Sequence, residues 1–165
     1  MRIGFGYDSH RFDASRTLML GGVRIDGAPG LAGHSDGDAL LHAITDALLG
    51  AAALGDIGSH FPDTDGRWRG ADSAALLSSA AREVATAGFS VSNIDATVIC
   101  ERVRIRPHAD AMRTRIAEIL GLAPSQVSVK GKTDEGLDAV GRGDAIRVHC
   151  VALLTTNHQP PTTNH

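Results

Sequence analysis

The chain has 165 residues, which at roughly 150 residues per domain corresponds to a single domain. Hydrophobic residues make up 42% and charged residues 21%, which excludes a disordered chain, and a net charge of −3 gives no basic surface for nucleic acid. No apolar stretch approaches the roughly 18 residues that span a bilayer, a secretion signal is not evident and only Cys100 and Cys150 are present, so we expect a cytoplasmic protein without nucleic-acid or membrane partners.

The first half of the chain is predicted to form two strands and two helices. Turn signals separate short strands at residues 2–8 and 17–25. A first helix is expected from about Asp36 to Ala53, with Ser35 as its N-cap. A loop rich in turn-forming residues covers 60–66, and a second helix is expected from about Asp72 to Ala87.

The second half is predicted to contain three strands around a third helix. A buried strand is expected at 94–100, a helix from Pro107 to Gly121, and two strands at 126–133 and 145–154. The polar residues 155–165 are expected to form a flexible tail, which leaves residues 1–154 as one domain. This order predicts an α+β sandwich of helices layered on a sheet, with ferredoxin-like βαβ elements.

Five ionisable residues near the start of the chain suggest a metal site. Asp8 and His10 lie two apart on a predicted strand, so their side chains share one face, although a surface pair beside a turn would look the same. In the apolar first helix, Asp38, His42 and Asp46 follow at intervals of four. Either the two carboxylates simply hold His42, or His42 binds a metal and the carboxylates orient its other ring nitrogen.

The nature of that metal stays open at this point. Two histidines and one carboxylate leave an open coordination position, as a catalytic zinc site requires. The same set of ligands also describes iron(II) oxygenases.

The loop after the first helix is acidic. Asp56, Asp63 and Asp65 stand among glycines that permit close backbone approach. Such a loop can accept hydrogen bonds from sugar hydroxyls or hold a hard cation, but aspartate and glycine are equally the residues of ordinary turns.

The two lysines of the chain lie near its C-terminal end. Lys130 and Lys132 are two apart on a predicted strand, with Thr133 beside them, and Arg142 stands between two glycines. These donors suit a phosphate, whereas lysines that guard an edge strand would explain the first two alone. Together the two halves predict a metal-dependent enzyme that acts on a phosphorylated small molecule.

At these residues the sequence closely resembles the 2-C-methyl-D-erythritol 2,4-cyclodiphosphate synthases of the non-mevalonate isoprenoid pathway. The resemblance spans about residues 1–154. It rests on the blocks Arg2-Ile3-Gly4, Asp8 with His10, Gly33-His34-Ser35-Asp36-Gly37-Asp38 with His42, Asp46-Ala47-Leu48-Leu49-Gly50, Gly55-Asp56-Ile57-Gly58, Phe61-Pro62-Asp63-Thr64-Asp65 and Gly141-Arg142-Gly143.

The resemblance implies a phosphorus–oxygen lyase. Its reaction converts 4-diphosphocytidyl-2-C-methyl-D-erythritol 2-phosphate into the 2,4-cyclodiphosphate and releases CMP. By similarity, Glu135 binds a magnesium or manganese ion that bridges the diphosphate, and His34 and Thr133 stabilise the transition state. The zinc ligands implied by the resemblance are Asp8, His10 and His42.

The resemblance also implies a homotrimer with active sites between subunits. Loop 61–65 with Ser35 would hold the erythritol part, Asp56 and Gly58 the ribose, and segments 100–106 and 131–133 the cytosine. In full, the implied substrate-binding residues are Asp8, Ser9, His10, His34, Ser35, Asp56, Ile57, Gly58, Phe61, Pro62, Asp63, Thr64, Asp65, Cys100, Arg104, Arg106, Gly131, Lys132, Thr133, Asp134, Glu135, Ala139 and Arg142.

The chain departs from the usual family pattern in three segments, 100–104, 131–132 and 138–139. All three lie on the expected nucleotide side or near the expected trimer axis, and Lys132 is a candidate for an additional phosphate contact. Two other functions remain as alternatives: an iron or zinc oxygenase or hydrolase with the same three ligands, and a trimeric metal- or nucleotide-binding module without catalysis.

Overall fold

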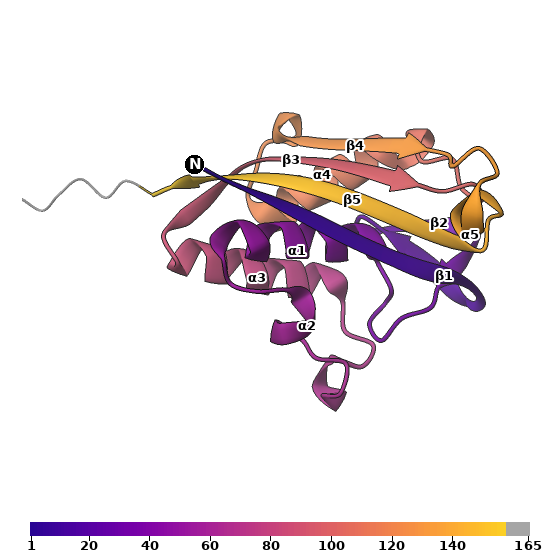
Figure 1. Cartoon of the computed structure of the whole chain (residues 1–165), viewed down its shortest axis with the longest axis horizontal. Coiled ribbons are helices and arrows are strands. Elements are labelled where there is room, and N and C mark those ends of the chain that lie inside the picture. Colours follow the sequence, from indigo (N-terminus) through magenta and orange to yellow (C-terminus); the bar gives the residue numbers. More distant parts are fainter. Residues whose placement is uncertain (158–165) are drawn as a thin grey trace, which may run out of the picture.

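A five-stranded sheet in the order β2-β1-β5-β3-β4 carries helices on one of its faces (Figure 1). The computed structural model describes residues 1–157, and the strands and helices named here lie within them. The strands are β1 (Arg2–Leu20), β2 (Val23–Leu31), β3 (Phe89–Ile99), β4 (Val127–Lys132) and β5 (Ala145–Thr156). The helices are α1 (Ala39–Ala52), α2 (Ile57–His60), α3 (Ser73–Thr86), α4 (Ala109–Leu120) and α5 (Asp138–Gly141), with 3-10 turns η1 (Gly66–Trp68), η2 (Arg106–His108) and η3 (Pro124–Gln126).

The sheet mixes parallel and antiparallel pairs. β5 lies between β1 and β3 and is antiparallel to both, and β2 is antiparallel to β1. β3 and β4 are parallel and are joined through α4, which makes one βαβ unit in the described part of the chain. The expected class, α+β with helices layered on a sheet, is confirmed.

Two glycines of β1 bring α1 against the sheet. A Cβ at Gly4 would lie 1.9 Å from the carbonyl oxygen of Ala47, and one at Gly6 would lie 1.9 Å from that of Ala43. Only glycine therefore allows the helix backbone to approach β1 this closely. Because side chains alternate along a strand, the next even positions of β1 also face α1.

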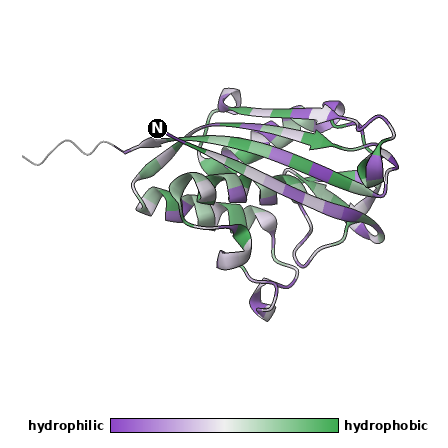
Figure 2. Cartoon of the chain, in the orientation of Figure 1, coloured by the Kyte–Doolittle hydropathy of each residue, from purple (hydrophilic) through white to green (hydrophobic). Residues whose placement is uncertain are grey.

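Hydrophobic residues fill the space between the helices and the sheet. Figure 2 shows hydrophobic and polar positions alternating along the central strands, as expected for a sheet with one covered face. α1 is buried on most of its surface, and Leu40, Ile44 and Leu48 are completely inaccessible. None of the helices in residues 1–157 is long and apolar enough to cross a membrane.

The uncovered face of the sheet keeps a stripe of apolar side chains on the odd positions of β1. Ile3, Phe5 and Tyr7 are 73%, 62% and 46% exposed, and Val151 of β5 is 42% exposed. The rings of Phe5 and Tyr7 lie 5.8 and 5.3 Å from that of His149 on the neighbouring strand. We call these five residues the apolar stripe.

The expected start of the first helix was wrong. α1 begins at Ala39, and its N-cap is Asp38 rather than Ser35. The Asp38 carboxylate accepts hydrogen bonds from Leu41 N and from the backbone N–H groups of Gly21 and Gly22, at 2.7–3.0 Å. One buried side chain therefore caps the helix and also holds the turn between β1 and β2.

Other boundaries also differ from the prediction: the expected strand 17–25 contains the turn between β1 and β2, and β3 begins at Phe89 rather than at residue 94. β1 continues from Arg2 to Leu20 because its first half pairs with β5 and its second half with β2, with a register shift between Asp13 and Thr17 that absorbs the turn signals. Pro107 lies in the 3-10 turn η2, and the regular helix α4 begins two residues later.

β5 extends two residues into the segment expected to be a tail. It ends at Thr156, and Asn157 N donates a hydrogen bond to Gly88 O at 2.8 Å. The rest of the predicted tail, residues 158–165, lies outside the described residues.

Candidate active site

Asp8 and His10 of β1 and His42 of α1 converge at one point, as the sequence predicted. Asp8 Oδ2 lies 2.9 Å from His10 Nε2 and 3.0 Å from His42 Nδ1, and the two nitrogens are 3.4 Å apart. Zinc bonds of about 2.0–2.2 Å in a tetrahedron place ligand atoms about 3.3 Å apart. The triangle therefore has nearly the size that a divalent metal requires, and the donor set suits one.

Asp8 and His10 each shift the pKa of the other. Burial acts to raise the pKa of the Asp8 carboxyl, but hydrogen bonds from His10 and His42 outweigh it and the pKa is lowered. Burial acts to lower the pKa of His10, but the hydrogen bond and the charge of Asp8 outweigh it and the pKa is raised. The site thus holds an ionised carboxylate beside His10, whose protonated form this carboxylate favours.

The partners of the second ring nitrogen of His42 differ from the prediction. His42 Nε2 lies 2.9 Å from Ser73 Oγ and 3.0 Å from Ser35 Oγ. Among the described residues, neither the Asp38 nor the Asp46 carboxylate forms a hydrogen bond to the His42 ring, because Asp38 caps α1 and Asp46 accepts from Ile57 N at 2.7 Å. Ser73 was not predicted, since a serine at the start of α3 reads as an ordinary helix-end residue.

The two histidines of the triad line a cavity of about 430 Å³, which we call the histidine pocket. Eight predicted residues line it: His10, His34, Ser35, His42, Ile57, Gly58, Phe61 and Asp63. Gly33, Trp68 and Leu76 complete the lining and were not predicted. Trp68 packs edge-on against Phe61 with ring centres 5.0 Å apart, and its buried indole N–H has no hydrogen-bond partner within residues 1–157.

The aspartates of the acidic loop were predicted either to bind a ligand or to stabilise turns, and the structure shows both environments. Asp56 caps the short helix α2 by accepting from Ser59, and Asp65 caps η1 and pairs with Arg67. These two carboxylates serve turns, whereas Asp63 lines the histidine pocket. The other expected residues of this loop, Pro62 and Thr64, are not among the lining residues.

Arg16 holds the loop that carries His34. Its guanidinium donates hydrogen bonds to Gly33 O at 2.6 Å and to Ser35 O. From the other side, Gly70 N donates to His34 O at 2.8 Å. The backbone on both sides of His34 is therefore held in place at the rim of the pocket.

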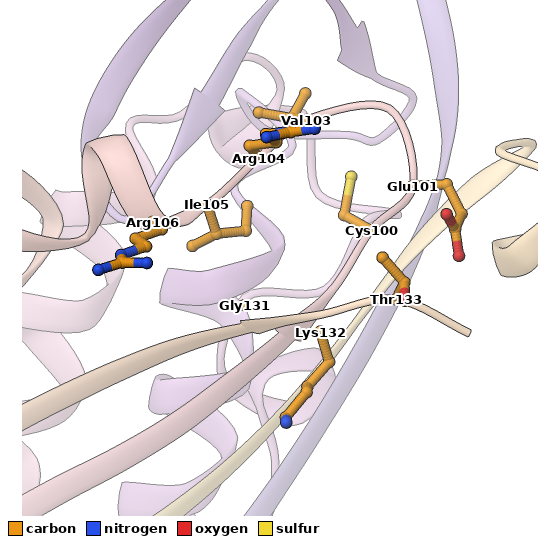
Figure 3. Close-up of a pocket in the computed structure, with 9 residues that line it drawn as sticks. All are labelled: Cys100, Glu101, Val103, Arg104, Ile105, Arg106, Gly131, Lys132 and Thr133. Atoms are coloured by element: carbon orange, nitrogen blue, oxygen red, sulfur yellow. The ribbon is translucent and has the colours of Figure 1, made fainter. Parts of the chain in front are cut away.

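A second cavity, of about 510 Å³, lies where β3 and β4 end, and we call it the β4 pocket (Figure 3). Its lining is Cys100, Glu101, Val103, Arg104, Ile105, Arg106, Gly131, Lys132 and Thr133, and includes every residue predicted from segments 100–106 and 131–133. A Cβ at Gly131 would lie 2.7 Å from that of Ile105, so glycine keeps the two segments close. Lys130 forms an ion pair with Asp95 at 2.7 Å and does not line the pocket.

The remaining predicted residues line neither pocket: Ser9 is exposed on β1, and the others follow β4. Glu135 has a left-handed backbone (φ 50°) and accepts a hydrogen bond from Thr133 Oγ1 at 2.6 Å. Such strain in a non-glycine residue is typical of functional positions. Asp134 pairs with Arg147 at 3.1 Å, Arg142 pairs with Asp144 at 3.3 Å, and Ala139 is exposed on α5.

Comparison with known proteins agrees with this geometry. The model of the YgbB family matches residues 1–155. The chain belongs to the YgbB family. A curated relative, the 2-C-methyl-D-erythritol 2,4-cyclodiphosphate synthase of Pseudomonas aeruginosa (strain UCBPP-PA14), is 57% identical over 154 residues, covering 93% of this chain and 98% of the relative. The resemblance drawn from the sequence motifs is confirmed.

A longer relative and a solved structure are also similar to this chain. A "Bifunctional enzyme IspD/IspF" of Anaeromyxobacter sp. (strain Fw109-5) is 56% identical over 92% of this chain, which spans only 39% of that longer protein. A solved structure described as a 2C-methyl-D-erythritol-2,4-cyclodiphosphate synthase in a CDP-bound form has a TM-score of 0.86 and 40% identity, with 93% of this chain and all of that chain covered.

Within a single copy of this chain, the two pockets lie at different strands of the sheet. Across the sheet, Lys132 is paired with Ile99, Ile99 with Arg147, and Arg147 with Ser9. Three strand spacings separate Lys132 from Ser9, which corresponds to about 14 Å. The metal triad and Thr133 therefore do not meet in a single chain.

Proposed function

We propose that this chain converts 4-diphosphocytidyl-2-C-methyl-D-erythritol 2-phosphate into 2-C-methyl-D-erythritol 2,4-cyclodiphosphate and CMP. The observation that carries this proposal is the triad of Asp8, His10 and His42, whose two histidines line the histidine pocket. As a phosphorus–oxygen lyase, the enzyme would act in isoprenoid precursor biosynthesis in the cytoplasm, and the two unpaired, buried cysteines support that compartment.

The reaction is an internal phosphoryl transfer. An oxygen of the 2-phosphate forms a bond to the β-phosphorus of the same molecule. The bond from that phosphorus to the bridging oxygen breaks, and CMP leaves with this oxygen on its α-phosphate. Because no external nucleophile is needed, catalysis is mainly positioning and neutralisation of charge.

The triad is proposed to hold zinc, which orients and polarises the diphosphate when it is bound. His34, on the loop held by Arg16, would donate a hydrogen bond to the phosphates as charge develops. Thr133 would do the same from the β4 pocket. Glu135, whose strained backbone lies beside Thr133, is the proposed ligand of a magnesium or manganese ion.

The two pockets divide the substrate between them. Phe61 and Trp68 give the histidine pocket an apolar wall suited to the methylerythritol carbons, with Ser35 and Asp63 as polar partners. Gly58, which lines this pocket beside Ile57, is proposed to contact the ribose together with Asp56, the cap of α2. The β4 pocket, of about 510 Å³ and lined by the closely packed segments 100–106 and 131–133, is proposed to hold the cytosine, in agreement with the CDP named for the solved relative.

A complete active site is proposed to form between subunits of a homotrimer. The roughly 14 Å between the triad and Lys132 leaves each chain with two half-sites. The apolar stripe on the uncovered face of the sheet is the surface proposed to be buried by assembly. A neighbouring copy would then bring its β4 pocket to the metal triad.

This function is tested by incubating the protein with the purified substrate, zinc and magnesium, and measuring the released CMP by chromatography. The His42→Ala variant is expected to lose at least 1,000-fold in rate, on the order expected when an essential metal ligand is removed. His108→Ala is the matched control, because His108 lies at the start of α4 outside both pockets. Full activity of His42→Ala, or no CMP from the unmodified chain, would contradict the proposal.

A further inference from the structure

The outer ring nitrogen of His42 meets a chain of hydrogen bonds that leads away from the triad. Ser73 Oγ lies 2.9 Å from His42 Nε2 and 2.5 Å from Asp36 Oδ1. Asp36 also accepts from the backbone N–H groups of Ser73 and Asp38, both at 3.2 Å. Ser73 is completely buried, so its hydroxyl meets these two groups and the Ser35 hydroxyl, 3.3 Å away, and not bulk water.

The direction of the protons in this chain follows from what each group can do. A carboxylate only accepts hydrogen bonds, so the contact between Ser73 and Asp36 uses the Ser73 proton. The Ser73 oxygen then offers only lone pairs to His42. His42 must therefore carry a proton on Nε2.

This proton arrangement leaves His42 Nδ1 as a bare lone pair when the ring is neutral. That atom lies 3.0 Å from the Asp8 carboxylate, which is also an acceptor. Two acceptors this close require a cation or a proton between them. The relay thus prepares His42 as a metal ligand through Nδ1.

Ser35 does not supply the same constraint. Its Oγ lies 3.0 Å from His42 Nε2 and accepts from Gly37 N at 3.1 Å, but it has no hydrogen bond to a carboxylate of the described residues. Its proton is free to point at either His42 or Ser73, whose Oγ is 3.3 Å away. Of the two serines beside His42, Ser73 is the one whose hydroxyl is oriented by a carboxylate.

We infer that Ser73 and Asp36 are positioning residues that fix the tautomer and orientation of His42 for the metal. Ser73 lies in the first turn of α3 and Asp36 in the loop before α1, so the position of the His42 ring depends on how these two segments pack. Partners of this kind typically contribute 10- to 100-fold to metal affinity. The inference rests on the metal centre proposed above.

Zinc affinity of the full-length chain, measured by competition with a chromophoric chelator, tests this role. Ser73→Ala is expected to bind zinc 10- to 100-fold more weakly than the unmodified protein. Ser79→Ala, a partly exposed serine on the same helix, is the matched control and is expected to bind normally. An affinity of Ser73→Ala within twofold of that control would overturn the inference.

A second variant and a spectroscopic signature separate positioning from simple loss of stability. Asp36→Asn keeps the size of the side chain but removes its charge, so it is expected to weaken zinc binding in the same direction and to add little in a Ser73→Ala background. In ¹⁵N spectra of the zinc-loaded protein, His42 is expected to show a slowly exchanging Nε2–H that is lost in Ser73→Ala. An unchanged Nε2–H signal, or additive effects of the two substitutions, would contradict the relay.

The same titration distinguishes this inference from the proposed function. If the unmodified chain fails to bind one zinc ion, the metal centre itself is contradicted. If the unmodified chain binds zinc and Ser73→Ala binds it equally well, only the positioning role fails.

Discussion

The two lysines of the chain have different environments although they lie two residues apart on β4. Lys130 is paired with Asp95, whereas Lys132 lines the β4 pocket. A contact between the Lys132 ammonium and a substrate phosphate would be made equally in the ground state and the transition state. Such uniform binding affects KM rather than kcat.

We therefore expect Lys132→Ala to raise KM about 10-fold, on the order of one charged hydrogen bond, with little change in kcat. Lys130→Ala serves as the control, since its partner is exposed and its loss leaves the pocket unchanged. Steady-state kinetics of CMP release give both constants. An unchanged KM for Lys132→Ala would show that this lysine makes no phosphate contact.

Cys150 provides a prediction that depends on pH. Its side chain is completely buried, and burial raises the pKa of its thiol to about 12. Only the thiolate reacts with alkylating agents, and at pH 8 about one molecule in ten thousand would carry it. Cys150 is thus expected to resist iodoacetamide in the folded protein at pH 8, as read by peptide mass spectrometry, and to react after unfolding in guanidinium. Rapid labelling of Cys150 without denaturant would contradict this burial.

How far the site could be predicted depended on whether the signal was local. The shared face of Asp8 and His10 follows from their spacing on a strand, and a lone histidine in an apolar helix pointed to His42. Ser73 could not be found in this way, because its role depends on how the start of α3 packs against α1. The same lack of tertiary information led to the wrong assignment of Asp38, whose partners lie in a turn 16–17 residues earlier.

At the scale of elements, the placement of His42 depends on how closely α1 approaches β1. A Cβ at Gly6 would collide with the backbone oxygen of Ala43, one residue after the metal ligand. We expect Gly6→Ala to lower the free energy of unfolding by about 1–3 kcal/mol or more, because the helix must move away from the sheet. Zinc affinity is expected to fall with it.

Gly50→Ala is the matched control for this prediction. Gly50 lies in the same helix, but a Cβ there would meet no atom within 4 Å. The alanine is expected to be neutral or to stabilise by up to about 1 kcal/mol, since it favours the helix. Urea unfolding of both variants measures the difference. A Gly6→Ala protein as stable as Gly50→Ala would show that close approach is not required.

The helices were easier to predict than the strands. α1 and α3 have long apolar periodicity and clear end signals, and their limits were predicted to within about three residues. β1 was predicted as a short strand because Asp13, Ser15 and Arg16 read as a turn. In the sheet these residues occupy a register shift that pairing on two sides sustains.

At the scale of the whole molecule, the apolar stripe and the divided site have one explanation in the proposed trimer. Phe5 is 62% exposed in the single chain, and a charge there would not disturb the core. We expect Phe5→Asp to fold and bind one zinc ion per chain, but to sediment as a monomer in analytical ultracentrifugation and to release no CMP.

Thr114→Asp is the control for the assembly prediction, because Thr114 is exposed on α4 in the helical layer. It is expected to assemble and turn over normally. An active, monomeric Phe5→Asp protein would contradict a site shared between subunits. The fold class itself was predictable from the order of elements, but the distance between the half-sites was not, because it depends on strand order in the sheet.

The most direct test of the proposed reaction is phosphorus NMR of the products formed from the diphosphocytidyl substrate with zinc and magnesium in ¹⁸O-labelled water. Internal attack by the 2-phosphate predicts one CMP per turnover and a product with two mutually coupled phosphorus signals and no ¹⁸O. A metal-dependent hydrolase with the same three ligands would instead give two uncoupled phosphates, one of them carrying ¹⁸O. That second result would contradict the cyclisation while leaving the metal triad in place.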